Sequence, residues 1–407
     1  TVVTASTLTA EAGNGYWINT TSNTCTITLP SSAEVGDQLV FIDYARTWGT
    51  NMIIIDSNGL NYQGDPDTYP VEYSTDGETL NIVYVDATKG WVPLNDDDVT
   101  DAPVAPPTQK GVIAYGQNAA GTRVSTSNLI NSSGVVATDT TGVGTARYAL
   151  GSAGYGGDKG IFAYGDSPSI VSMSNLVNNS GVIATDTTGV GSARLALAAA
   201  VYGGDKAIFG FGVTNWSPTT LVSMTNLVTN AGVVGTDVTG VGTTRGGLGC
   251  TEYGDDKAIF GYGATYSPGP SYYVAMSNLV SNTGVVATDT TGVGTSLTDI
   301  SATGYGSSGE GLFFYGEISS ATMVNTRNKI SNTGVVGATI SAAGTARRLA
   351  PACRYGGDKA VTAMGYVDAY PISTSNLISN SGVIASDTTG VGTARRGARA
   401  VGYSFSA

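Results

Sequence analysis

The chain has 407 residues and a formal net charge of −12, and charged residues make up 12% of it, about half of the usual share of roughly 25%. An acidic surface disfavours phosphate backbones, so nucleic-acid binding is not expected. The sequence contains no His, which excludes a Ser-His-Asp triad, His-based acid–base catalysis and His-ligated metals. The sequence has no run of 18 apolar residues, so insertion into a membrane is not expected. No cofactor is expected either.

Residues 1–95 carry no internal repeat, and their pattern predicts a small all-β domain. Short runs rich in Val, Ile, Tyr, Phe and Thr alternate with turns such as SNGLN and STDGE, a pattern typical of strands. The strand candidates are residues 24–30, 37–44, 51–56 and 79–86. The opening TVVTASTLTA lacks the basic and apolar segments of a signal peptide, so none is expected.

Residues 96–109 are predicted to be a linker. The stretch is rich in Asp and Pro, which do not form strand or helix interiors and favour an extended spacer. The alternative to a solvated linker is a cation held by Asp96 to Asp98.

From residue 110 to residue 407 a block of about 50 residues recurs six times. An Asn in an SNL-like triplet marks each copy, with spacings of 47, 51, 52, 50 and 48 residues. The marking residues are Asn128, Asn175, Asn226, Asn278, Asn328 and Asn376. Periods of roughly 40–50 residues made of short apolar runs and Gly turns indicate the blades of a β-propeller.

Each copy contains four runs that predict strands. In the third copy these runs are residues 195–203, 207–212, 221–228 and 231–242. The first copy lacks the first of the four runs, and the chain ends with an orphan copy of it, Arg395 to Ala407. We therefore expect an all-β chain in which a six-bladed propeller is closed by its C-terminal strand, because closure protects sheet edges.

The order of signals within a copy resembles kelch repeats. An Arg ends one copy, small and apolar residues follow, and an aromatic-bearing strand then ends in Gly. The double Gly lies earlier than in kelch, in YGGDK, and no Trp precedes the Arg, so the resemblance implies a kelch-like propeller. Another type of propeller or a β-solenoid is the alternative. The fifth copy departs most, with Leu297 in place of the Arg and SSGE (307–310) in place of GGDK.

The N-terminal segment resembles a β-domain of tail-fibre and appendage proteins of tailed phages. The resemblance rests on Gly15-Tyr16, Leu29-Pro30, Gly36-Asp37, Asp43-Tyr44 and Gly90-Trp91. The SNLVSNTGVVATDTTGVGTAR wording of the repeats is also similar to arrays in phage and marine viral structural proteins. Together they imply a virion appendage, exposed on the virion surface, whose partners are other virion proteins, further copies of itself and a host-surface glycan or receptor.

The acids and tyrosines that recur in nearly every copy are interpreted as scaffold. Asp in TDTTG and in the Asp-Lys turn is suited to hydrogen-bond turn amides or to pair with Lys or Arg, and a repeated calcium site is the alternative. The recurring Tyr before the Gly-Asp-Lys turn is expected to pack between blades. The sequence has three cysteines, Cys25, Cys250 and Cys353, and neither a disulfide nor a zinc site is expected. Cys250 and Cys353 are predicted to be buried as small apolar residues.

The positions that vary between copies carry the candidate binding residues. The loop after the aromatic strand changes in length and content, and loops on a rigid scaffold carry recognition. Its aromatics are Trp216, Tyr266, Tyr272, Tyr273 and Tyr370. Exposed aromatics stack on sugars or fill partner pockets, although packing over the loop backbone or against a neighbouring subunit is an open alternative.

Three functions remain after these observations. The first is a structural appendage whose propeller binds a host surface or a neighbouring subunit. The second is an extracellular polysaccharide-degrading enzyme using Asp or Glu, and the third is a cellular secreted adhesin or surface-layer protein. Near-uniform repeats favour the first, so no catalytic residue and no metal site are predicted.

Overall fold

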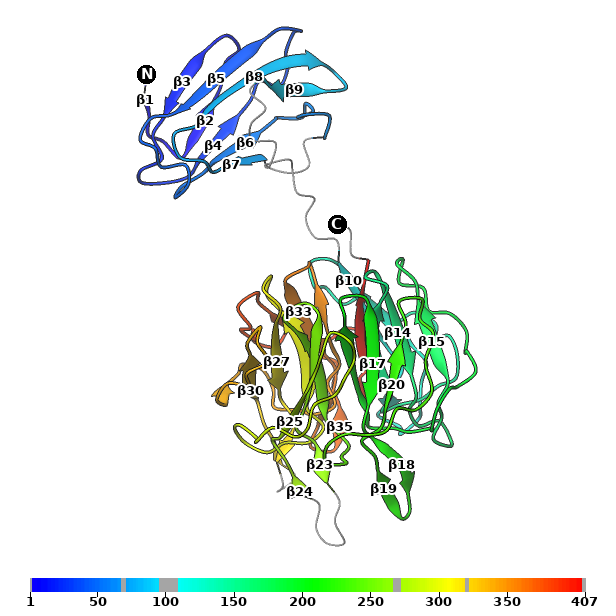
Figure 1. Ribbon diagram of the computed structural model, residues 1–407. Coiled ribbons are helices and arrows are strands. Elements are labelled where there is room, and N and C mark those ends of the chain that lie inside the picture. The colour runs from blue at the N-terminus through cyan, green and yellow to red at the C-terminus, as the bar shows by residue number, and fades with distance from the viewer. Residues whose placement is uncertain (1, 67–70, 95–108, 266–271, 319–321, 405–407) are drawn as a thin grey trace. The chain divides into compact units, whose positions relative to one another are not determined.

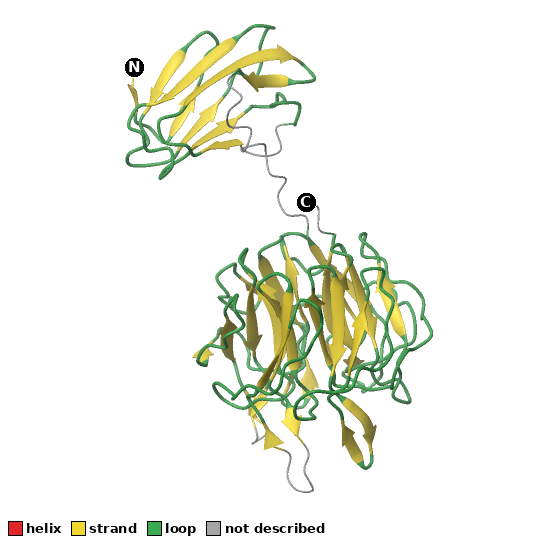
Figure 2. Ribbon diagram, viewed as in Figure 1, coloured by secondary structure: helices red, strands yellow, loops and turns green. Residues whose placement is uncertain are grey.

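The computed structural model describes residues 2–66, 71–94, 109–265, 272–318 and 322–404. Over these residues every regular element is a strand (Figure 2), which confirms the predicted all-β class. No helix of the described chain is long and apolar enough to cross a membrane. Its contacts divide the chain into two compact units, Thr1–Pro106 and Pro107–Ala407.

The N-terminal unit consists of two sheets between which the chain alternates. One sheet has the order β1 (Val2–Val3), β3 (Gly15–Ile18), β5 (Gln38–Asp43), β8 (Thr79–Asp86) and β9 (Gly90–Pro93). The other has the order β2 (Thr7–Thr9), β4 (Cys25–Thr28), β6 (Ile53–Asp56) and β7 (Val71–Tyr73). Strands β1 to β6 pair in parallel within their sheets, and β7, β8 and β9 are added antiparallel.

The core of this unit lies between the two sheets. Every second residue of β5 and β8 is buried, as the two-residue period of a strand requires. Phe41, Trp48 and Trp91 are fully buried there. The four strand candidates of the sequence correspond to β4, β5, β6 and β8, and the remaining five strands were not predicted.

The C-terminal unit contains six antiparallel sheets of three or four strands, one for each repeat (Figure 1), beside smaller two-stranded sheets. Sheet I consists of β38 (Arg399–Tyr403), β10 (Lys110–Ala114) and β12 (Ser127–Ile130), sheet II of β13 (Gly151–Tyr155), β14 (Lys159–Ala163) and β15 (Ser174–Val177), and sheet III of β16 (Ala198–Tyr202), β17 (Lys206–Gly210) and β20 (Thr225–Val228). Sheet IV consists of β21 (Gly249–Tyr253), β22 (Lys257–Gly261) and β25 (Ser277–Val280), sheet V of β26 (Ser301–Tyr305), β27 (Glu310–Phe314), β30 (Thr326–Ile330) and β31 (Ile340–Ser341), and sheet VI of β32 (Ala352–Tyr355), β33 (Lys359–Ala363) and β36 (Ser375–Ile378). Sheet I therefore takes its first strand from the C-terminus, because β38 pairs with β10.

The first strands of the six sheets contact one another in a sequence that returns to its start. Neighbouring contacts run from β38 to β13, β16, β21, β26 and β32, and β32 contacts β38. Backbone hydrogen bonds follow the same order at both ends of these strands. We call the first series the loop-end ring, in which each residue donates its N–H to the carbonyl of the previous member and Ala149 donates to Gly397. Its members are Ala149, Ala196, Gly247, Asp299, Leu349 and Gly397.

All six residues of the loop-end ring have a positive φ, between 51° and 65°. Such a backbone turns the N–H and the carbonyl of each residue toward its two neighbours. For a non-Gly residue this conformation costs roughly 1–2 kcal/mol, and four of the six members are not Gly. At the opposite end a second series of six bonds joins neighbouring sheets, for example from Gly156 N–H to the Asp205 carbonyl. Sheet I has no turn between its first two strands, and there the bonds run from Gly356 N–H to the Gln109 carbonyl and from Ser404 N–H to the Asp158 carbonyl.

The prediction of four strands per repeat is wrong for most copies. The fourth run pairs with the third strand at only two isolated bridges. In sheet III these bridges join Val228 to Val234 and Thr225 to Val238. Between these bridges the side-chain amide of Asn226 donates to the Gly235 carbonyl and to Asp237. A side chain thus takes the place of a backbone ladder, and only sheet V has a fourth strand among the described residues, β31.

Candidate functional site

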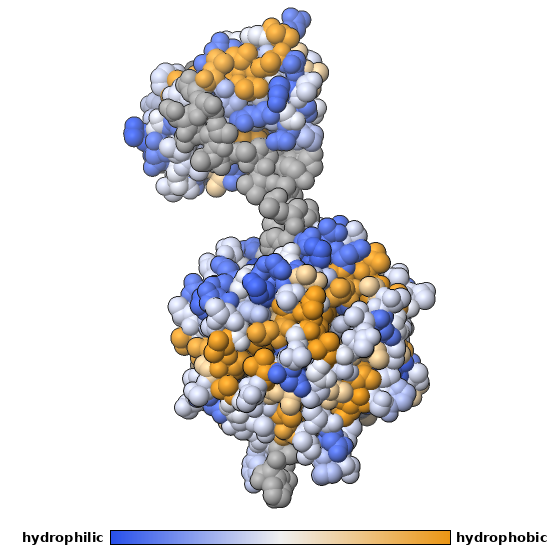
Figure 3. Space-filling model, turned by 45° about the vertical axis from the view of Figure 1, so that its right-hand side comes forward, coloured by the Kyte–Doolittle hydropathy of each residue, from blue (hydrophilic) through white to orange (hydrophobic). Residues whose placement is uncertain are grey.

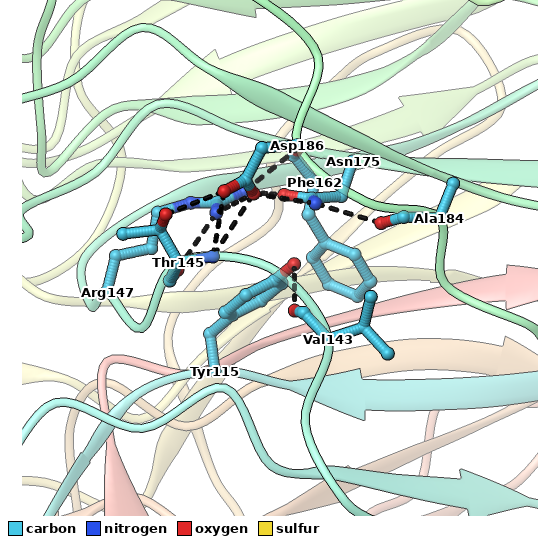
Figure 4. A network of polar contacts seen from close by, with 8 residues as sticks. All are labelled: Tyr115, Val143, Thr145, Arg147, Phe162, Asn175, Ala184 and Asp186. Carbon is cyan, nitrogen blue, oxygen red and sulfur yellow. Dashed lines mark hydrogen bonds and ion pairs between the residues drawn. The ribbon is translucent and has the colours of Figure 1, made fainter.

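A polar network repeated around the C-terminal unit holds the sheets together. In Figure 4 the guanidinium of Arg147, which is fully buried, donates from Nη2 to Asn175 Oδ1 at 2.6 Å. Asn175 in turn donates to Asp186, and Asp186 also accepts from the N–H and the hydroxyl of Thr145. The same guanidinium lies 4.3 Å from the ring centre of Tyr115 in sheet I. The network therefore joins two sheets through one cation–π contact and one charged hydrogen-bond chain.

Five repeats contain this Arg–Asn–Asp network, and the fifth lacks it. There the Arg position is Leu297, and Thr339 replaces the Asp as the partner of Asn328. The cation and the anion are thus lost together, so neither is left buried without its partner. In the first repeat the network joins the last residues of the repeats to the first copy: Arg395 donates to Asn128, and Thr393 donates to Asp139.

The pKa values of the charged residues in the network are shifted in the directions that their contacts explain. Burial tends to raise the pKa of Asp186, but hydrogen bonds from Thr145 and Asn175 and the charge of Arg147 outweigh it, so this pKa lies below its ordinary value. Burial lowers the pKa of Arg245 to about 10. The interpretation of these acids as scaffold is confirmed, because their oxygens are occupied by turn amides, hydroxyls and Asn side chains.

The Asp-Lys turns form ion pairs between neighbouring residues. Asp205 lies 2.9 Å from Lys206, and Asp158, Asp256 and Asp358 are paired with Lys in the same way. The recurring Tyr before each turn is buried against a neighbouring repeat: Tyr155, for example, lies where a Cβ on Gly232 of sheet III would collide with it. Both interpretations made from the sequence, paired acids and packing tyrosines, are confirmed.

Metal-binding and thiol chemistry find little support in the described part of the chain. In those residues no three Cys, Asp or Glu side chains gather as a metal site would require. Asp96 to Asp98, the alternative cation site, lie outside the described residues. Cys250 and Cys353 are buried as predicted, Cys25 is buried too, and burial raises the pKa of Cys353 to about 12.

The variable loops gather at one end of the C-terminal unit, which we call the loop end. Four hairpins form there: β18 (Val213–Trp216) with β19 (Thr219–Leu221), β23 (Ala264–Thr265) with β24 (Tyr272–Tyr273), β28 (Glu317–Ile318) with β29 (Thr322–Met323), and β34 (Tyr366–Val367) with β35 (Tyr370–Pro371). In the first repeat β11 (Gln117–Asn118) pairs there with β37 (Arg395–Arg396). In Figure 1 the hairpins β18/β19 and β23/β24 project from this end.

The structure separates the five candidate aromatics. Trp216, Tyr272 and Tyr370 are exposed, at 49%, 55% and 56% of their full accessible surface. Tyr273 instead faces the fold, and its hydroxyl donates to Glu317 Oε1 at 2.8 Å. Tyr266 lies outside the described residues. Three aromatic side chains of the loop end are thus available to a partner.

Sequence reasoning missed a charged cluster beside these hairpins. Arg348 lies 2.6 Å from Asp299 and 3.1 Å from Glu317, and Glu317 is the residue that accepts from Tyr273. Burial raises the pKa of Asp299, although the charge of Arg348 opposes the shift. Each of these charged residues departs from the repeat pattern, and that departure was the available signal.

A cavity of about 190 Å³ lies at the centre of the loop end. All six repeats contribute to its wall, including five members of the loop-end ring, and Trp216 is the one candidate aromatic among its lining residues. Its charged lining consists of Asp299 and three arginines, Arg348, Arg396 and Arg399. Because the whole chain carries a net charge of −12, this cationic lining is unlike the rest of the molecule.

The flank of the C-terminal unit offers a second surface. Each repeat exposes a valine at the same position of its fourth run, and these are Val135, Val182, Val233, Val285, Val335 and Val383. Figure 3 shows apolar side chains gathered across the flank of this unit. Singly exposed apolar residues are common on soluble proteins, so the loop end remains the stronger candidate site.

Comparison with known proteins gave no assignment. No protein-family model matches the chain, and no curated protein matches it. The functional argument therefore rests on the residues and the geometry described above.

Proposed function

We propose that the chain is a structural virion appendage whose C-terminal unit is a six-bladed, kelch-like β-propeller that binds a host surface. Six similar sheets, first strands in cyclic contact and hydrogen bonds that return to their starting residue support the propeller. In this arrangement the loop-end cavity lies on the propeller axis. The small N-terminal unit attaches the propeller to the virion or to further copies of the chain.

The observation that carries the binding role is the combination of exposed aromatics and a cavity at the same end. Trp216 belongs to both, and Tyr272 and Tyr370 lie on hairpins of that end. Aromatic rings on loops of a rigid scaffold suit the faces of sugars or the pockets of a partner protein. The opposite end carries repeated, internally paired Asp-Lys turns, which leave little variation for recognition.

The N-terminal unit has an apolar face that suits an attachment role. Trp17 on β3 is 47% exposed, and its partner in the neighbouring strand β1 is the exposed Val2. Outward-facing apolar residues on an ordered sheet are typical of surfaces that become covered on assembly.

Imaging and binding test the two halves of this proposal. Antibody raised against residues 110–407 is expected to label assembled particles from producing cells, and labelling of cell envelopes alone would favour a cellular adhesin.

The double variant Trp216→Ala and Tyr272→Ala is expected to lose host-cell binding with an unchanged circular dichroism spectrum. The control variant Val233→Ala and Val285→Ala removes equally exposed apolar groups from the flank and is expected to bind normally.

One observation favours the enzyme as a second candidate. Asp299, an acid that does not recur in other repeats, lines the cavity with a raised pKa, and raised carboxyl pKa values suit general acids. Both Asp299 and Glu317 are held by Arg348, which argues for a structural role. Release of reducing sugar from host polysaccharide by the wild-type protein, lost in Asp299→Asn, would replace the binding function by this one.

A further inference from the structure

We propose that the loop-end cavity binds a carboxylate-bearing sugar residue, such as a uronic or sialic-type acid, through Arg396 and Arg399. This inference rests on the proposed function for its biological setting, but the chemistry of the cavity carries it independently. Among the described residues neither arginine forms an ion pair, Arg399 breaks the repeat, and two aromatic residues share the lining of the cavity.

Two of the three arginines form no ion pair in the described part of the chain. Arg348 is paired with Asp299 and Glu317. Arg396 donates twice to the neutral amide oxygen of Gln117, at 2.9 and 2.7 Å. Arg399 donates to the Ala398 carbonyl at 3.2 Å, and its charge interacts with that of Asp299 without a direct contact. Because three arginines face a single acid in the lining, the wall of the cavity retains donors for an anion.

Arg399 is not part of the repeated scaffold. It stands four residues before the recurring Tyr, and the other repeats have small residues or Pro there: Gly151, Ala198, Gly249, Ser301 and Pro351. Burial lowers the pKa of Arg399, although the charge of Asp299 opposes the shift, so desolvation of this guanidinium costs free energy. A fold that accepts a small residue or Pro at the five equivalent places does not need a guanidinium at the sixth.

The size and the remaining lining of the cavity also suit a sugar. At about 190 Å³ it is smaller than the roughly 300–1,000 Å³ typical of pockets for drug-sized ligands, and it therefore suits one sugar unit or a chain end. Tyr148 and Trp216 belong to the lining, and aromatic rings stack on the apolar face of a sugar. A planar guanidinium fork matches a carboxylate through two parallel hydrogen bonds.

The direct test measures binding of small sugars to the full chain. Glucuronate and N-acetylneuraminate are titrated by ligand-observed NMR, with glucose as the neutral control. We expect both acids to bind, glucose to bind at least tenfold more weakly, and affinity to fall as NaCl is raised from about 50 to 500 mM because charged contacts are screened. Equal binding of glucose and the acids would overturn the proposal, and tighter binding of glucose 6-sulfate than of either acid would overturn the carboxylate assignment.

Variants then place the site. Arg399→Ser installs the residue that Ser301 provides in sheet V, so the fold is expected to persist, and the affinity for the acids should fall at least tenfold. Lys206→Ala removes the same charge at the opposite end and is the matched control, for which unchanged affinity is expected. Equal losses in both variants would indicate a general effect of net charge and would contradict the site.

Host-cell binding distinguishes failure of this inference from failure of the proposed function. If cells are bound equally by wild type and Arg399→Ser, and free glucuronate does not compete, the appendage function stands and the acidic-sugar site is wrong. If the purified protein binds the acids through Arg399 but does not label virions, the site stands and the appendage function is wrong.

Discussion

At the residue scale, five of the six repeats contain a fully buried arginine that links two neighbouring sheets. Arg194 is fully buried, lies 4.5 Å from the Tyr164 ring of the preceding sheet, and donates to Asn226 of its own sheet. Removing one partner of such a group leaves an uncompensated buried charge, which is costly. The fifth repeat has neutral residues at both positions, with Leu297 in place of the Arg and Thr339 in place of the Asp.

A double-mutant cycle in sheet III tests this account. Asp237→Thr is expected to destabilise the protein by about 1–3 kcal/mol, a discounted value because the carboxylate is 31% exposed. Arg194→Leu with Asp237→Thr copies the pair of the fifth repeat and should cost less than the sum of the two single variants, by about 1 kcal/mol or more. Urea unfolding gives the three values, and strict additivity would contradict the coupling.

The sequence predicted which recurring residues are scaffold but not the cluster at the cavity. A recurring Asp next to turn residues already implies hydrogen bonds to the backbone, and Asp186 fulfils that role. By contrast, Asp299, Glu317 and Arg348 become partners only when two repeats are placed side by side. Separation along the chain hides such pairs, and the visible sign was that each residue breaks the repeat.

At the element scale, strand prediction succeeded where apolar alternation extends over several residues. β8 has the predicted range, Thr79–Asp86, because buried and exposed positions alternate along most of it. β1 and β2 have two and three residues, too few to show a period. In the repeats the fourth run shows strand-forming residues, yet the inserted Asn side chain interrupts its ladder, an effect that propensity does not reveal.

Deleting Arg396 to Ala407 tests the role of the last strand. The deletion removes β38, which pairs with β10 over five residues from Lys110 to Ala114 and contacts β13 and β32. Sheet I would then expose an unpaired edge, so we expect a melting temperature lower by several degrees or aggregation. A truncated protein that melts within a degree of wild type, measured by circular dichroism, would contradict the importance of this strand.

At the scale of the whole molecule, the lowered pKa values of the repeated Asp residues predict how stability depends on pH. Nine repeated Asp residues have a lowered pKa, five in the Arg–Asn–Asp networks and four in the Asp-Lys turns. A depressed folded-state pKa stabilises the fold above the unfolded value of about 3.9, and this stabilisation is lost as pH falls through the folded value. Asp299, whose pKa is raised, contributes with the opposite sign.

We therefore expect the melting temperature to vary little between about pH 5 and 7 and to fall steeply below about pH 4. Differential scanning calorimetry across this range provides the measurement. The double variant Arg194→Leu with Asp237→Thr lacks one depressed acid and should show a shallower fall. An unchanged melting temperature at pH 3 would mean that these acids are not held by the contacts described here.

The pairing of β10 with β38 has a consequence for synthesis of the protein. The hydrogen bond from Arg395 to Asn128 joins residues 267 positions apart, so the first sheet of the unit stays incomplete until β38 has been synthesised. Joining segments so distant carries a loop-closure penalty and slows folding. A nascent chain that has emerged only up to the fifth repeat therefore exposes open strand edges and is prone to aggregate. Synthesis of β38 covers the edge of β10 and removes this hazard.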